Sequence, residues 1–188
     1  TREYMNLGGK GVNVSRVLTN LEVPNVALGF VAGFTGDALR NGLERMGVKT
    51  DFISLEEGNT RINVNIKGVE ETDINARGPE IPNSAIDELF KKLDNLQSGD
   101  TLVLAGSIPT SLPNDMYERI MERLYGKGIR FVVDATRDLL VKSLKYEPFL
   151  IKPNNHELGE IFGLELTTDN EIIYYARELK KQGAKNVL

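Results

Sequence analysis

The chain has 188 residues, of which 40% are hydrophobic and 27% charged, and its formal net charge is −4. This length and apolar content suit one globular domain with its own core. The acidic balance argues against a nucleic-acid partner, the lack of cysteine excludes disulfides and cysteine metal sites, and no apolar run is long enough for a membrane span. With no signal-peptide pattern, we expect a cytoplasmic protein.

A glycine-rich motif, Gly8-Gly9-Lys10-Gly11-Val12-Asn13, stands where the first predicted helix, Val12–Leu21, begins. Glycine lets a backbone approach a ligand closely, and the free N–H groups of a helix start attract anions. Lys10 adds a full positive charge. The motif therefore predicts a site for a small polar or phosphorylated molecule. It is not a P-loop, because a glycine follows the lysine, and it fails the dinucleotide fingerprint, which disfavours a nicotinamide oxidoreductase.

The rest of the chain alternates between strand and helix patterns. Strands are expected at 25–32, 49–53, 101–104, 130–133 and 149–151, and helices at 36–46, 83–96, 112–125, 139–144, 157–162 and 171–181. The last residues, 184–188, read as the start of another buried strand. Serial strand–helix–strand units predict an α/β fold, with a mostly parallel sheet and helices on both faces.

One segment breaks this pattern. Residues Arg61–Lys67 alternate strictly between polar and apolar, and a second short strand, Thr72–Asn75, follows Gly68 and the acidic pair Glu70-Glu71. This predicts an antiparallel hairpin with one wet face, in a small sheet that covers a site or a partner. Arg61 opens the polar face, either as a solvated edge charge or as a clamp on a substrate phosphate.

Polar residues also follow the predicted strands, where α/β sheets bind ligands. Ser107 either belongs to a simple turn or binds phosphate. Asp134 either has a structural role or supports the residues that contact the ligand. Lys152 suits a phosphate as a point charge. Asn154 and Glu157 have the spacing of a helix capping box, and Glu157 is alternatively a Mg²⁺ ligand through water. The single histidine, His156, is read as a solvated helix-start residue.

Taken together, these loops resemble the PfkB (ribokinase-like) carbohydrate kinases. The matching motifs occur in the family's order: Gly8-Gly9-Lys10-Gly11-Val12-Asn13-Val14, Gly33-Phe34-Thr35-Gly36-Asp37, Thr60-Arg61-Ile62-Asn63-Val64, Gly78-Pro79-Glu80-Ile81, Ala105-Gly106-Ser107-Ile108-Pro109 and Lys152-Pro153-Asn154-Asn155-His156-Glu157-Leu158. The resemblance implies a ribokinase-like α/β sandwich with a small β lid. It also implies Mg²⁺-assisted phosphoryl transfer from ATP to a ketose monophosphate, fructose 1-phosphate to fructose 1,6-bisphosphate. Tagatose 6-phosphate is the alternative substrate.

The resemblance also implies a role for each candidate residue. The sugar hydroxyls would be bound by Gly8, Gly9 and Asn13, and the sugar phosphate would be contacted by Lys10, Arg61 and Ser107. The ATP phosphates would be contacted by Lys152 and Asn154, and Glu157 would bind the Mg²⁺ shell through water. Residues 58–78 would form the lid, which in relatives also makes the dimer contact, so a homodimer is expected.

Two features of the family are missing from the sequence. These are the N-terminal strand with its sugar-binding aspartate, and the downstream Gly-Ala-Gly-Asp motif, which supplies the anion hole and the catalytic base. We therefore expect residues 1–188 to be a partial kinase domain that lacks its nucleotide-binding part and, alone, has no useful kinase activity. The rival reading is a non-catalytic sugar-phosphate-binding module.

Overall fold

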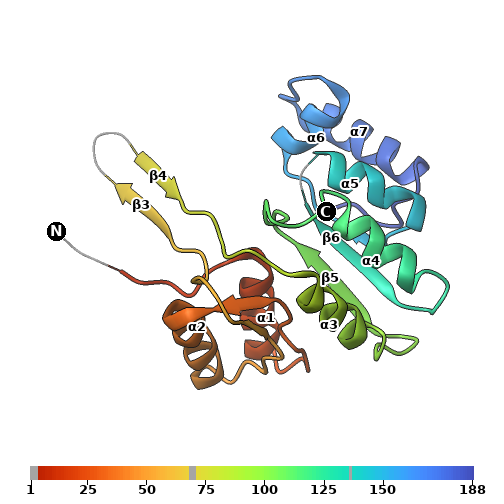
Figure 1. Cartoon of the computed structure of the whole chain (residues 1–188). Helices are drawn as coiled ribbons and strands as arrows, with labels where there is room; N and C mark the ends of the chain where they lie inside the picture. Colours follow the sequence, from red (N-terminus) through yellow and green to blue (C-terminus); the bar gives the residue numbers. More distant parts are fainter. Residues whose placement is uncertain (1–3, 68–70, 136) are drawn as a thin grey trace. The chain divides into compact units, whose positions relative to one another are not determined.

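The computed structural model describes residues 4–67, 71–135 and 137–188 (Figure 1). Its helices are α1 (Lys10–Asn20), α2 (Gly33–Arg45), α3 (Asn83–Leu93), α4 (Met116–Leu124), α5 (Arg137–Ser143), the short 3-10 helix η1 (Leu144–Tyr146), α6 (Asn155–Phe162) and α7 (Asp169–Lys181). Its strands are β1 (Phe30–Ala32), β2 (Ile53–Leu55), β3 (Asn63–Lys67), β4 (Glu71–Asn75), β5 (Thr101–Ala105), β6 (Arg130–Asp134) and β7 (Leu150–Ile151). The chain forms two compact units, Thr1–Lys91 with Pro109–Leu112 and Lys92–Ile108 with Pro113–Leu188.

The first unit is built on the parallel pair β1–β2, in which Phe30 lies opposite Ile53. Both strands are shorter than predicted and β2 is shifted toward the C-terminus. Pairing nevertheless extends back to a bridge between Ala27 and Thr50, so the two apolar runs do pair with each other. Helix α2 begins at Gly33 rather than Gly36, directly after β1. Its buried Leu43 packs with Ala27 and Val48 as the core of this unit.

The predicted hairpin is confirmed as the antiparallel pair β3–β4, with Val64 opposite Ile74. It extends away from α1 and α2 (Figure 1). The predicted turn at Gly68 and Glu70 lies outside the described residues. Apolar side chains on one face of the hairpin are exposed, with Val64 at 46% and Ile74 at 55% of full accessibility. Exposed apolar side chains gathered on one face are typical of a surface that a partner covers.

The second unit is built on the parallel sheet β5–β6–β7. Val187 forms a parallel bridge with Ile151, which confirms the predicted strand start at the end of the chain. Helix α4 begins at Met116, later than predicted, and is preceded by a turn in which the Met116 N–H donates to the Pro113 carbonyl at 3.1 Å. The predicted stripe on this helix is buried, comprising Met116, Ile120, Met121 and Leu124. Helices α4, α5, α6 and α7 contact one another in succession.

The α/β class and the parallel pairing are confirmed. The first unit contains the parallel pair β1–β2 and the second the parallel sheet β5–β6–β7. Helix α3 confirms the predicted helix but ends at Leu93, before Leu96. In the described ranges, no helix combines the length and the apolar character that crossing a membrane requires.

Candidate functional site

The glycine motif forms an exposed helix start in the first unit. Helix α1 begins at Lys10, two residues before the predicted start at Val12, so Lys10 lies in its first turn together with Asn13. Gly9 ends the loop with φ 117°, a backbone angle that favours glycine. Among the residues that the structure describes, no side chain caps this helix start, and its first turn contains no acidic residue. Backbone N–H groups and the helix dipole thus give this end a partial positive charge.

Arg61 follows a tightly held threonine in the same unit. The hydroxyl of Thr60 accepts a hydrogen bond from the Ala32 N–H at 2.8 Å, and the Thr60 N–H donates to the Ala32 carbonyl at 2.9 Å. The Thr35 hydroxyl donates to the Thr60 carbonyl at 2.8 Å. A Cβ on Gly36 would lie 2.9 Å from the Thr60 hydroxyl oxygen, so this position must stay small. The exposed Arg61 therefore begins the hairpin from a fixed point at the end of β1.

The second unit brings three of the predicted loops to one edge of its sheet. Ser107 follows β5, Asp134 ends β6 and Lys152 follows β7, so all three lie at the carboxyl ends of neighbouring parallel strands. Lys152 Nζ lies 3.4 Å from Asp134 Oδ1. Asp134 is mostly buried and the Lys152 side chain is half exposed. The arrangement places a hydroxyl, a carboxylate and a cation along the edge at which α/β folds bind their ligands.

Asn154 and Glu157 form the capping box of α6. Asn154 Oδ1 accepts from the Glu157 N–H at 2.8 Å, and Glu157 Oε2 accepts from the Asn154 N–H at 2.9 Å. The capping alternative is therefore confirmed. The same motif recurs at the start of α7, where Thr168 and Glu171 cap each other. His156 is exposed in the first turn of α6.

Glu157 can take part in a Mg²⁺ site as a single carboxylate that binds through water. Within the described part of the chain, His, Cys, Asp and Glu side chains form no group of three or more suited to a metal. Mg²⁺, however, is commonly held by one or two carboxylates together with waters and substrate phosphates. The cap engages Oε2 of Glu157, and the carboxylate has a second oxygen for a metal-bound water. Glu157 can thus serve both purposes.

Sequence reasoning missed Tyr117, which lies beneath the Ser107 loop. Its phenol donates a hydrogen bond to the Gly106 carbonyl at 3.1 Å. Burial, with a contribution from the negative charge of Asp134, raises the pKa of Tyr117 from 10.0 to about 12. A signal was available in the sequence. Tyr117 precedes Ile120, Met121 and Leu124 by three, four and seven positions, so it is a polar-tipped residue on an apolar helix face.

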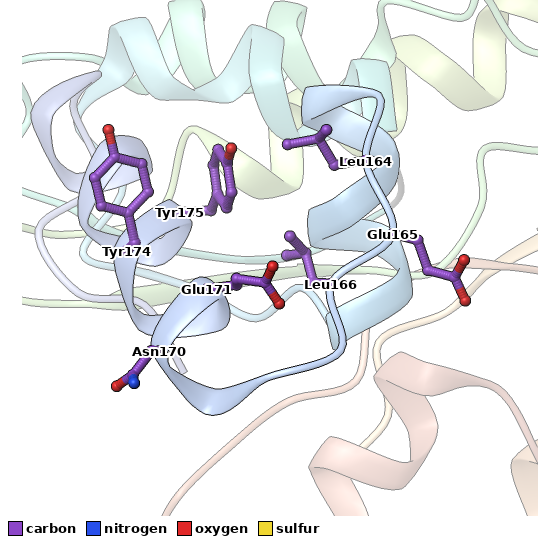
Figure 2. A pocket seen from close by; sticks show the side chains of 7 residues that line it. All are labelled: Leu164, Glu165, Leu166, Asn170, Glu171, Tyr174 and Tyr175. Atoms are coloured by element: carbon purple, nitrogen blue, oxygen red, sulfur yellow. The ribbon is translucent and has the colours of Figure 1, made fainter.

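A hollow of about 380 Å³ lies elsewhere in the second unit, at the connection between α6 and α7 (Figure 2). Its lining includes none of the predicted site residues and consists of Leu164, Glu165, Leu166, Asn170, Glu171, Tyr174 and Tyr175. Its Glu171 carboxylate already accepts hydrogen bonds from Thr167 and Thr168. We therefore treat this hollow as part of the helix packing and not as the site.

Parallel strands with polar residues at their carboxyl ends, and a glycine-rich helix start, are both typical of small-molecule-binding proteins of the α/β class. Comparison with known proteins makes this more specific. The chain belongs to the pfkB family of carbohydrate kinases, whose family model matches residues 3–188.

Individual relatives agree with this assignment. The chain is 45% identical over 181 residues to 1-phosphofructokinase of Bacillus subtilis and 38% identical over 181 residues to D-tagatose-1-phosphate kinase of Bacillus licheniformis. These alignments cover 96% of this chain and 59% of each relative. The structure of Escherichia coli phosphofructokinase-2 in complex with fructose-6-phosphate matches with a TM-score of 0.84 and 25% identity, over 96% of this chain and 61% of that one. The chain thus spans about three-fifths of these relatives.

Proposed function

We propose that the whole protein transfers the γ-phosphoryl group of ATP to a hydroxyl of fructose 1-phosphate, giving fructose 1,6-bisphosphate. The observation that carries this proposal is the 45% identity to the 1-phosphofructokinase of Bacillus subtilis, which extends across nearly all of this chain. Because the chain spans only 59% of that relative, the activity is assigned to the whole protein and not to residues 1–188 alone.

In this proposal the first unit holds the sugar. Gly8 and Gly9 leave room for close approach, and Asn13 binds sugar hydroxyls from the first turn of α1. Lys10 and Arg61 bind the sugar phosphate. Arg61 suits this role because a guanidinium matches phosphate geometry with two parallel hydrogen bonds. The anchoring of Thr60 supports the role, because it limits where the arginine can reach.

The second unit supplies the remaining phosphate contacts. Ser107 binds the sugar phosphate, while Lys152 and Asn154 bind ATP phosphates at the carboxyl edge of β5–β6–β7. Glu157 would hold Mg²⁺ through water. Mg²⁺, when bound, neutralises phosphate charge during transfer. Lys152 contributes to the same neutralisation as a fixed cation, which is the main task of the protein in such reactions.

We expect residues 1–188 alone to have no useful kinase activity. Phosphoryl transfer needs a group that accepts the proton of the attacking hydroxyl, and the sequence lacks the Gly-Ala-Gly-Asp motif that the family resemblance assigns to this task. Detectable ATP-dependent phosphorylation of fructose 1-phosphate by the purified 188-residue chain would contradict this expectation.

A second substrate, tagatose 1-phosphate, is favoured by the relative named D-tagatose-1-phosphate kinase. Fructose and tagatose are ketohexoses that differ at one hydroxyl, so a site that holds one phosphorylated ketose discriminates weakly unless it contacts that hydroxyl. The name of this relative shifts the tagatose alternative from the 6-phosphate to the 1-phosphate.

The exposed apolar face of the hairpin supports a homodimer. Ile62, Val64, Ile66 and Ile74 are each about half exposed on a two-stranded sheet, and an isolated hairpin of this kind is marginally stable in water. A second copy of the same hairpin would cover this face and at the same time fix the hairpin as a lid. One related structure is described as the tetrameric inhibited form of Escherichia coli phosphofructokinase-2, so a relative does assemble.

The deciding experiment is a substrate panel on the whole protein with ATP and Mg²⁺, measured by ADP release. The panel contains fructose 1-phosphate, tagatose 1-phosphate, tagatose 6-phosphate, fructose 6-phosphate and free fructose. We expect the highest kcat/KM with fructose 1-phosphate. Binding of fructose 1-phosphate without turnover of any of these sugars would instead favour the sugar-phosphate-binding module.

A further inference from the structure

The loop that follows β5 is held from two sides at Gly106. The Gly106 N–H donates to the Asp134 carbonyl at 3.0 Å, and the Gly106 carbonyl accepts from the Tyr117 phenol at 3.1 Å. Gly106 has φ 94°, which most other residues adopt only with strain. The N–H and the carbonyl of Gly106 are therefore both hydrogen-bonded, which fixes the backbone just before Ser107.

Holding the Gly106 carbonyl also orients the next amide. The carbonyl of Gly106 and the N–H of Ser107 belong to the same planar peptide group, and no peptide bond in the described ranges is cis. In a trans peptide these two groups point in opposite directions. Because the carbonyl points to the Tyr117 phenol, the Ser107 N–H points away from α4.

The phenol of Tyr117 is suited to be a permanent donor. Its raised pKa, about 12, keeps the hydroxyl protonated throughout the neutral and moderately alkaline range. The neighbouring Asp134 carboxylate is partnered by Lys152 at 3.4 Å. Tyr117, Gly106, Asp134 and Lys152 thus connect α4 to the ends of all three strands of the sheet.

We propose that Tyr117 is a positioning residue, which fixes the Gly106–Ser107 peptide so that the N–H and hydroxyl of Ser107 together bind the phosphate of the substrate. This rests on the proposed function, in which Ser107 binds the sugar phosphate. Tyr117 does not touch the substrate. It acts by keeping the two donors of Ser107 oriented before the ligand arrives, which lowers the cost of ordering them on binding.

The test compares the whole wild-type protein with Tyr117→Phe, which removes only the phenolic oxygen. The control is Tyr125→Phe, which makes the same change in an exposed tyrosine at the end of the same helix. We expect Tyr117→Phe to raise the KM for fructose 1-phosphate about tenfold, with kcat and the KM for ATP within about twofold, because a group that binds ground state and transition state alike acts on KM. Tyr125→Phe should match wild type. An unchanged KM, or a fall in kcat alone, would overturn the proposal.

A second readout does not depend on the substrate. The Gly106 N–H is hydrogen-bonded, and its hydrogen exchange should become about tenfold faster in Tyr117→Phe if the phenol holds the loop. Unchanged exchange at Gly106 would overturn the positioning role even if the enzyme phosphorylates fructose 1-phosphate. Conversely, exchange at Gly106 could be faster in Tyr117→Phe although the whole protein binds no sugar phosphate. That result would keep Tyr117 as the residue that holds the loop and would overturn the proposed function.

Discussion

Lys152 and Asp134 lie 3.4 Å apart at the ends of two neighbouring parallel strands, β7 and β6. The lysine proposed to bind ATP phosphates thus already has a carboxylate partner. A phosphate that binds Lys152 must either share the cation with Asp134 or displace it. This competition leads to a prediction for both residues.

Replacing Asp134 with Asn should strengthen the binding of metal-free ATP about threefold to tenfold, because the substitution removes a negative charge beside the site and releases Lys152. Lys152→Met should weaken the same binding by a similar factor. Isothermal titration calorimetry with EDTA present measures both. Equal affinity in all three proteins would place the ATP phosphates elsewhere.

The two capping boxes allow structural and functional roles to be separated. Asn154→Ala and Thr168→Ala should each lower the free energy of unfolding by about 1 kcal/mol, since each removes the side-chain acceptor at a helix start. Chemical denaturation measures this loss. The two substitutions are matched, because α6 and α7 start with the same pair of reciprocal hydrogen bonds.

Mg²⁺ binding is the property in which the two boxes should differ. Glu157→Gln should raise the Mg²⁺ concentration needed for half-maximal activity of the whole protein, because it removes the carboxylate charge proposed to hold the metal. Glu171→Gln should leave it unchanged, although Glu171 fills the equivalent position in α7. If both variants respond alike, Glu157 is a cap only.

Arg61 should act on phosphorylated sugar alone. Arg61→Ala should raise the KM for fructose 1-phosphate by a factor that corresponds to about 1.5–3 kcal/mol, the usual worth of a hydrogen bond to a charged group. Use of free fructose, where it occurs, should be spared. Arg77→Ala is the control, since Arg77 is also an exposed arginine and lies where the chain leaves the hairpin. Equal losses with both sugars would assign Arg61 another role.

The apolar face of the hairpin should control assembly. Ile74→Asp places a charge on that face opposite Val64, and it should shift the protein toward the monomer in sedimentation velocity. Asn63→Asp adds the same charge on the other face, opposite the uncharged Asn75, and should leave the oligomeric state unchanged. A dimer that survives Ile74→Asp would be held by a different surface.

The stability that the ion pair between Asp94 and Arg123 contributes to the fold should depend on pH in the acid range. Arg123, with help from Lys127, lowers the pKa of Asp94 from its ordinary value of 3.8 to about 2. A carboxylate whose pKa is lower in the folded state stabilises the fold above its unfolded pKa, and this contribution fades as pH falls toward the folded value. The difference in Tm between wild type and Asp94→Asn should therefore be constant above about pH 5 and shrink between about pH 4 and pH 2. A difference independent of pH would contradict this assignment.

Patterns that depend on local periodicity were predicted well. The alternation of Arg61–Lys67 identified the hairpin, and the spacing of Ile120 and Leu124 identified the buried face of α4. Boundaries were less predictable where competing signals overlap. Gly33 and Gly36 both suit a helix start; α2 begins at Gly33, and Gly36 lies inside the helix where it packs against Thr60.

The loops of the candidate site were predictable from the sequence, but the contacts that hold them in place were not. Placing Ser107, Asp134 and Lys152 at strand ends followed from the α/β pattern. The contact between Tyr117 and Gly106 did not, because the sequence shows a polar-tipped residue on an apolar helix face but not which strand end its hydroxyl contacts. Whether Asn154 caps or binds was also undecidable from spacing, because its side chain carries both the oxygen that accepts in a cap and the amide N–H groups that could donate to a phosphate.

The anchoring of Thr60 determines what any movement of the hairpin does to Arg61. Thr60 is held through its N–H, its carbonyl and its hydroxyl, so the chain is clamped one residue before the arginine. A hinge at this place puts Arg61 next to the pivot, whereas Ile66 and Thr72 lie farther out along the arm. Opening the hairpin would displace Ile66 and Thr72 by a large distance and Arg61 by a small one. A sugar phosphate held by Arg61 could therefore remain attached while the hairpin moves to admit or release the second substrate.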